Sequence, residues 1–91
     1  MGSRVFEDFD LRISEAVLQK INDRGISRLD VEVAVYTSDA PVETDDPKHV
    51  PPETWLLIGR TLDGERIIEV YVTPYWQLKV LKVKTSFLLE Y

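Results

Sequence analysis

The chain has 91 residues, of which 44% are apolar and 30% charged, with no cysteine and a formal net charge of −5. This length predicts a single domain spanning residues 1–91, and the absence of cysteine excludes disulfides and thiolate metal sites. No apolar run reaches the roughly 20 residues of a membrane-spanning helix, and no signal-peptide pattern opens the chain, so the expected compartment is the cytoplasm.

The charge is divided unevenly along the chain. Residues 1–54 carry six Lys and Arg against twelve Asp and Glu, a sum of −6, whereas residues 55–91 carry five against four, a sum of +1. Nucleic-acid-binding domains are usually basic overall, so the acidic total counts against that class. A site for a polyanion is therefore expected only as a local patch in the C-terminal half. Residues 1–3 receive no weight, because Met-Gly-Ser is typical of an expression tag.

Two helices are predicted in the first half, after a short edge strand at residues 4–6. The first helix begins after a cap at Asp10 or Ser14 and runs to about Arg24, where Gly25 can take the left-handed conformation that ends helices. Its apolar side chains fall on one helical face. They are Ile13, Val17, Leu18 and Ile21.

Residues 27–30 have the form of a capping box, in which the Ser27 hydroxyl and the Asp30 carboxylate satisfy free amides at a helix start. The segment 28–36 admits two interpretations. Its apolar positions 29, 33 and 36 have helical spacing, but positions 31, 33 and 35 alternate as in a strand. The cap favours the helix.

Residues 38–54 are predicted to be a loop, because they contain four prolines and a run of acidic residues. Within it, Pro41–Glu43 is expected to pair briefly at a sheet edge. Three strands follow at residues 55–61, 65–73 and 78–85, where runs of β-branched and aromatic residues are separated by turn sequences. Asp63-Gly64 is a hairpin signal, since both residues tolerate positive φ. The third strand changes parity at Val80-Leu81, which predicts a β-bulge.

This order predicts an α+β fold, with two N-terminal helices packed on one face of a three- to four-stranded antiparallel sheet. The helices are expected to contribute Val17, Leu18, Ile21, Leu29 and Val33 to the core. The sheet is expected to contribute Leu56, Ile58, Ile68, Val70, Val72, Leu81 and Val83.

Arg60, Lys82 and Lys84 are the first candidate functional group. Lys82 and Lys84 share a strand face by the two-residue period, and Arg60 shares the face of Leu56 and Ile58 only if that face is not uniformly buried. If neighbouring strands bring the three cations together, they can hold a phosphodiester and stabilise the charge that develops in RNA cleavage. The alternative is that they are solvated side chains that deter edge pairing.

Tyr71, Tyr75, Trp76 and Tyr91 are the second candidate group. Exposed aromatic rings beside basic residues can stack on single-stranded bases, and on this interpretation Tyr71 and Trp76 bind substrate. The alternative is that these rings close the rim of the core with their polar ends in water.

His49 is the only histidine, and its ordinary pKa suits a general base near neutral pH. Together with Asp45 and Asp46 it is also a weak metal signal, for which the alternative is a solvated loop. The sequence has no zinc-ligand spacing, Gly-rich phosphate loop or Ser/His/Asp pattern, so neither a metal nor a cofactor is predicted.

Four short segments carry a resemblance to a known family. They are FEDFD at 6–10, LQKINDRGIS at 18–27 with DVE at 30–32, WLLIGRT at 55–61 with DGER at 63–66, and VKTSF at 83–87. In this order they resemble the BrnT toxins and a related small domain family of unassigned function, which share the RelE/ParE-like fold of bacterial toxin–antitoxin systems. The resemblance also favours a helix at 28–36.

The resemblance implies a type II toxin: an endoribonuclease that uses the RNA 2′-hydroxyl as nucleophile and is neutralised by a cognate antitoxin encoded beside it. Arg60 would then be the phosphate-contacting arginine and Lys84 the basic residue of the last strand, with Lys82 and Tyr91 at the same site. The alternative is a non-catalytic protein-interaction module of the same fold, which the acidic total and the single loop histidine favour. The expected partner is the antitoxin, with RNA or a second copy of the chain as the other candidates.

Overall fold

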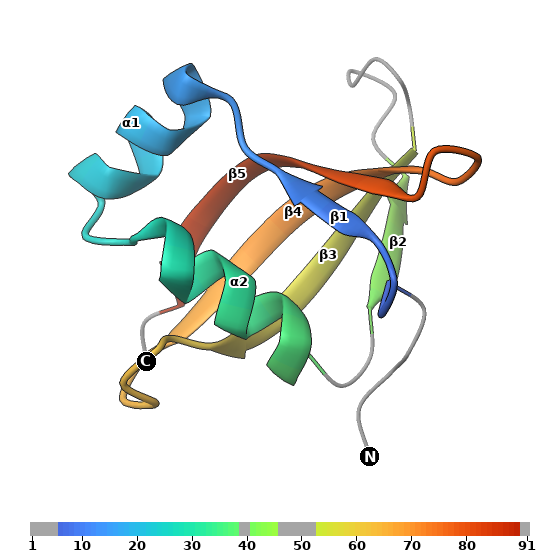
Figure 1. The fold of residues 1–91 in the computed structure, drawn as a ribbon. Helices are drawn as coiled ribbons and strands as arrows, with labels where there is room; N and C mark the ends of the chain where they lie inside the picture. The colour runs from blue at the N-terminus through green and yellow to red at the C-terminus, as the bar shows by residue number, and fades with distance from the viewer. Residues whose placement is uncertain (1–5, 39–40, 46–52, 90–91) are drawn as a thin grey trace.

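The computed structural model describes residues 6–38, 41–45 and 53–89. In chain order its elements are β1 (Asp10–Arg12), α1 (Glu15–Asp23), α2 (Arg28–Thr37), β2 (Val42–Asp45), β3 (Glu53–Arg60), β4 (Ile67–Tyr75) and β5 (Val80–Leu89). The strands form one five-stranded sheet in the order β1-β5-β4-β3-β2. Figure 1 shows α2 lying across the sheet and α1 beside β5.

The predicted three- to four-stranded antiparallel sheet is wrong, because the sheet has five strands and is mixed. β1 pairs in parallel with β5 from Asp10↔Val80 to Arg12↔Lys82, and the other neighbouring strands are antiparallel. The edge strand expected at residues 4–6 forms at 10–12 instead; residues 4 and 5 lie outside the described part, and Phe6 belongs to a turn. A parallel pair needs a crossover connection, so local sequence patterns do not reveal which strand β1 joins.

Local signals set the ends of both helices. The Ser14 hydroxyl accepts a hydrogen bond from the Val17 N–H at 3.3 Å and caps α1, and Gly25 follows the helix with φ of +80°. The capping box at α2 is complete, since the Ser27 hydroxyl accepts from the Asp30 N–H at 3.1 Å and the Asp30 carboxylate accepts from the Ser27 N–H at 2.9 Å. Segment 28–36 is therefore helical.

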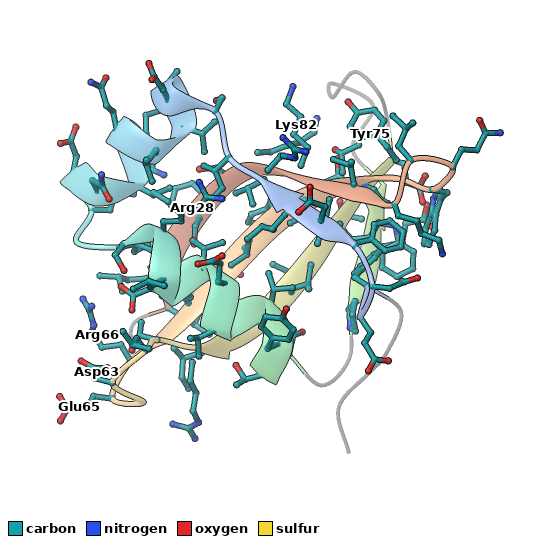
Figure 2. The ribbon with its side chains drawn as sticks, viewed as in Figure 1. Arg28, Asp63, Glu65, Arg66, Tyr75 and Lys82 are labelled. Carbon is teal, nitrogen blue, oxygen red and sulfur yellow. The ribbon has the colours of Figure 1, made fainter. Side chains whose placement is uncertain are left out.

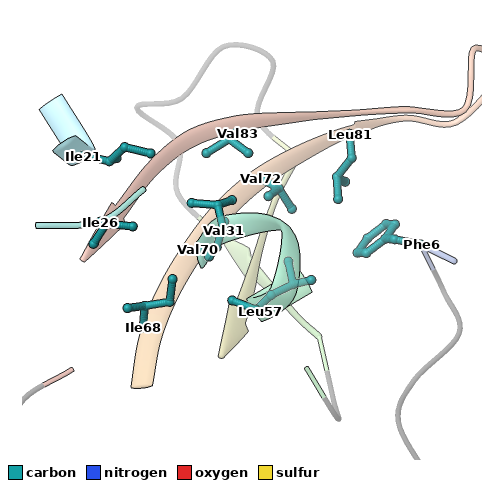
Figure 3. Packing of buried hydrophobic residues seen from close by; sticks show 11 residues of the cluster. Phe6, Ile21, Ile26, Val31, Leu57, Ile68, Val70, Val72, Leu81 and Val83 are labelled. Atoms are coloured by element: carbon teal, nitrogen blue, oxygen red, sulfur yellow. The ribbon is translucent and has the colours of Figure 1, made fainter. Parts of the chain in front are cut away.

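The core lies between the helices and one face of the sheet, as Figure 3 shows for its largest side chains. Its buried members are Phe6, Ile21, Ile26, Val31, Ala34, Leu57, Ile68, Val70, Val72, Leu81 and Val83. The prediction of four further core residues is therefore wrong: Leu29, Val33, Leu56 and Ile58 are not among the buried members. On α2 the buried positions are Val31 and Ala34, while Leu29 is 55% exposed.

Gly59 explains why β3 places Leu57 in the core in place of Leu56 and Ile58. A Cβ atom added to Gly59 would lie 2.1 Å from the Ala34 carbonyl oxygen, so the missing side chain lets the α2 backbone approach the strand. Because side chains alternate along a strand, Leu57 faces the helices together with Gly59. Leu56, Ile58 and Arg60 then share the opposite face.

A β-bulge is present in β5, but not at the predicted Val80-Leu81. Tyr71 pairs with Thr85 and Val72 pairs with Val83, which leaves Lys84 as the additional residue. At Val80 and Leu81 the register with β4 is continuous, and it is the shift around Lys84 that changes the parity of the strand.

Candidate interaction surface

The three predicted cations are spread over the sheet. Arg60 pairs with Ile67, which in turn pairs with Leu89, whereas Lys82 pairs with Thr73. Leu89 and Lys82 are seven positions apart on β5, so Arg60 and Lys82 lie roughly 20 Å apart along the strand direction. Figure 2 shows Lys82 beside β1, and Asp63, Glu65 and Arg66 of the β3–β4 turn at the other end of the sheet.

The contacts of Arg60 also tie it to that turn. Its guanidinium Nη1 donates to the Gly64 carbonyl at 3.2 Å, and its backbone N–H donates to the Thr37 hydroxyl at 3.0 Å. Lys84 is the extra residue of the bulge, so simple alternation no longer pairs it with Lys82. The three cations therefore do not converge on one phosphodiester.

The aromatic residues expected to bind substrate are separated as well. Tyr71 is half-buried and its ring meets Phe87 edge-on, with centroids 6.2 Å apart. Burial, and after it the neighbouring Glu69 carboxylate, raises the pKa of Tyr71 above its ordinary value. Tyr91 lies outside the described residues.

Trp76 belongs to an aromatic cluster formed with Phe6, Phe9 and Trp55, whose ring centroids lie 5.3–6.2 Å apart. The Trp76 and Trp55 indole N–H groups both donate to the Glu53 carboxylate at 3.0 Å. Trp76 therefore closes the hairpin end of the core, and it does not stack beside Tyr71. The spacing of Glu53 and Trp55, two residues apart on one strand face, is a signal from which this pair could have been predicted.

The histidine interpretation falls outside the described residues, because His49 and Asp46 are not among them. Among the residues that are described, no group of three or more His, Asp or Glu side chains is placed to hold a metal ion.

The sheet face turned away from α2 carries an apolar group instead, which we call the open face and define by Leu56, Ile58, Tyr71 and Phe87. Ile58 and Phe87 flank Glu69 in one cross-strand row and are 44% and 39% exposed. In the next row Leu56 pairs with Tyr71. Large apolar side chains in adjoining rows of one face are typical of a protein-binding surface.

Arg24 bounds the open face at β5. Its guanidinium lies 4.3 Å from the centroid of the Phe87 ring, and its Nη1 donates to the Thr85 hydroxyl at 2.9 Å and to the Ser86 carbonyl at 3.0 Å. From the sequence, Arg24 is expected only as the end of a helix. No local pattern predicts its contacts, since its partners are more than sixty residues away along the chain.

The outer edge of β5 is only partly paired. β1 covers Val80–Lys82, and in the described part of the chain no strand continues along residues 83–89 on that side. Because the Ser86 carbonyl points to Arg24 on this side, the backbone N–H and C=O of Ser86 and, two residues on, of Leu88 face outward. We call the outer side of residues 83–89 the free β5 edge.

Comparison with protein-family models, with curated proteins and with solved structures finds no match to this chain. In the described residues, no helix combines the length and the apolar character needed to cross a membrane.

Proposed function

We propose that this chain is a non-catalytic protein-interaction module, which binds an extended segment of a partner protein along the free β5 edge. The observation that carries the proposal is the stretch of β5 at residues 83–89, which pairs with no further strand in the described part of the chain and is bordered by the exposed Phe87 ring. A bound segment would displace the Arg24 guanidinium from the Ser86 carbonyl. An extended peptide added to such an edge gains main-chain hydrogen bonds, and side-chain contacts with the adjoining face give specificity.

Charge indicates the character of the bound segment. Arg24, Lys82 and Lys84 lie along or beside β5, in a chain whose total charge is −5. A partner segment that alternates apolar and acidic residues would place carboxylates beside these cations and apolar side chains beside Phe87. An antitoxin encoded next to this gene remains one candidate source of such a segment.

A selection from a library of displayed peptides tests the proposal. We expect enrichment of extended sequences that alternate acidic and apolar residues. Binding should weaken about tenfold in Arg24→Glu, because a carboxylate then faces the acidic peptide. Arg60→Glu is the matched control, since it makes the same charge change on the sheet but away from the free β5 edge, and it should bind as the unchanged protein does.

Amide hydrogen exchange gives a direct readout of strand addition. The amides of Ser86 and Leu88 should become protected when the peptide binds, whereas those of Thr85 and Phe87, which already face β4, should change little. No enrichment, or binding without new protection at Ser86 and Leu88, would overturn the proposal.

The ribonuclease prediction is tested on the same protein samples. It requires cleavage of RNA that is lost in Arg60→Ala, whereas the interaction module predicts no cleavage and unchanged peptide binding in that variant. RNA cleavage dependent on Arg60 would replace the proposed function with the toxin interpretation.

A further inference from the structure

A groove on the helix side of the sheet lies outside the surface described above. α2 packs on β3 and β4, whereas α1 packs on β5, so the part of β5 next to β1 receives no helix directly above it. The result is a cavity of about 170 Å³ between the β1 segment and α2, with Leu81 of β5 among its lining residues. We call this cavity the β1–α2 groove.

The lining combines aromatic rings with negative charge. Among the described residues that line it, Phe6, Phe9 and Tyr36 contribute rings, Glu7, Asp10 and Glu32 contribute carboxylates, and Arg28 contributes a guanidinium. Figure 2 shows Arg28 at the beginning of α2. Arg28 is exposed, so water screens its charge, whereas Glu32 is half-buried.

Glu32 is a half-buried acid in this groove. Within the described residues its carboxylate has neither a hydrogen-bond partner nor an ion-pair partner. Asp10, by contrast, is already engaged by the Arg12 guanidinium at 2.9 Å. A half-buried carboxylate beside aromatic rings is an environment that attracts a cation.

The Phe9 ring, which lines the groove, already contacts one ammonium group. The Lys79 Nζ atom lies 5.2 Å from the centroid of the Phe9 ring and 3.5 Å from a carboxylate oxygen of Asp8. An ammonium beside a ring and a carboxylate is thus already present next to the groove.

Ser38 is an independent observation next to the groove. Its hydroxyl is buried, with 2% of the residue exposed, and has no hydrogen-bond partner among the described residues. It lines a second cavity of about 30 Å³ that shares Phe6 and Tyr36 with the groove. This volume suits one hydroxyl group or one water molecule.

From these observations we infer that the β1–α2 groove binds a small organic ammonium ion that carries a hydroxyl group. The ammonium lies between the aromatic rings and Glu32, and the hydroxyl reaches Ser38. A volume of about 170 Å³ is below the roughly 300–1,000 Å³ of drug-sized sites, which restricts the ligand to a few heavy atoms. The inference is independent of the proposed function, because none of these residues lies on the open face or the free β5 edge.

The test is an NMR titration of the full chain with choline, which has this chemistry, and with its neutral carbon analogue, which has the same shape without the charge. We expect choline to shift the amide signals of β1 and α2, and the neutral analogue to bind about tenfold more weakly. No shift in these elements, or equal binding of the two compounds, would overturn the inference.

Variants assign the contacts. Glu32→Gln and Tyr36→Leu should each weaken choline binding several-fold, and Tyr36 is 78% exposed, so its replacement leaves the fold intact. Glu65→Gln, an equal charge change on the exposed β3–β4 turn, is the control and should have no effect. Unchanged binding in Glu32→Gln refutes the site.

Two further experiments test whether the ligand's hydroxyl contacts Ser38 and whether the ammonium belongs to a free ion or to a partner protein. Ser38→Ala should weaken binding of choline but not of tetramethylammonium, which has no hydroxyl; equal effects on both would remove Ser38 from the site. A peptide with a trimethyl-lysine, which has no hydroxyl, distinguishes a partner's side chain from a free ammonium ion: weaker binding than choline supports the free ion, and tighter binding would overturn the inferred ligand.

Discussion

Replacement of Asp30 tests how the chain joins α2 to the β3–β4 turn. Asp30 is 7% exposed, and its two carboxylate oxygens accept from two different backbone amides. Oδ2 accepts from the Ser27 N–H and Oδ1 from the Leu62 N–H, both at 2.9 Å, while the Arg66 guanidinium lies 3.9 Å from Oδ2. One side chain therefore completes a helix cap and fastens a distant turn to it.

The double-acceptor role leads to an unusual expectation for Asp30→Asn. An asparagine of the same shape keeps one acceptor oxygen but turns an NH₂ group toward the other amide, which leaves that amide without an acceptor. An unsatisfied buried donor costs about 1–3 kcal/mol, so Asn should lower the free energy of unfolding by about that amount. Asp30→Ala loses both acceptors and should cost about 2–4 kcal/mol, the upper part of the range for a lost cap.

Urea denaturation followed by circular dichroism measures both values. With a slope near 1 kcal/mol per molar urea for a domain of this size, a loss of 2 kcal/mol moves the midpoint by about 2 M. Glu65→Gln makes the same charge change on an exposed side chain of the same turn and should leave the midpoint nearly unchanged. An Asp30→Asn midpoint equal to that of the unchanged protein would refute the double-acceptor role.

The pH dependence provides a second check. Burial raises the pKa of Asp30, but the hydrogen bonds from Ser27 and Leu62, together with Arg66, outweigh it and hold the pKa below the ordinary 3.8. A carboxyl whose pKa is lower in the folded state stabilises the fold above its unfolded pKa, and this contribution is lost as the pH falls through the folded pKa. The stability difference between the unchanged protein and Asp30→Asn should therefore be constant from pH 7 to about 5 and shrink below about pH 4.

Two further predictions concern packing. Gly59→Ala should lower the free energy of unfolding by about 2–3 kcal/mol, since the new Cβ would meet the Ala34 backbone. Gly64→Ala should lower it by only about 1 kcal/mol, because Gly64 has φ of +74° but open space around it. Equal losses for the two variants in urea denaturation would contradict this distinction. Glu53→Ala should lower it by about 1–2 kcal/mol and shift tryptophan emission to longer wavelength, because both indole N–H groups lose a charged acceptor; an unchanged emission spectrum would count against that network.

The sequence was sufficient for the features that depend on neighbouring residues. The Ser27–Asp30 pair predicted where the second helix begins, Gly25 predicted how the first one ends, and Asp63-Gly64 predicted the hairpin turn. For the start of the first helix the sequence offered two caps, Asp10 and Ser14, of which the structure uses Ser14. Each of these signals acts within a few residues, through hydrogen bonds to the backbone or through the φ that a glycine can adopt. The structure that each signal specifies therefore does not depend on the rest of the fold.

The sequence did not predict which face of β3 is buried. Residues 55–58 are all apolar, so alternation gives no polar marker for the outer side, and the contact of Gly59 with Ala34 decided the question. For the same reason Leu56 and Ile58 were expected in the core, whereas they lie on the open face.

Only the tertiary structure decided the candidate site. The distance between Arg60 and Lys82 and the bulge at Lys84 follow from the register of β3, β4 and β5, and the contact of Arg24 with Ser86 follows from the packing of α1 beside β5. Register depends on pairings between residues far apart in the chain, whose free energy comes from burial across the whole sheet and not from any local pattern. The residue types for an anion site were present in the sequence, but the fold placed Arg60 on β3, far from Lys82 on β5.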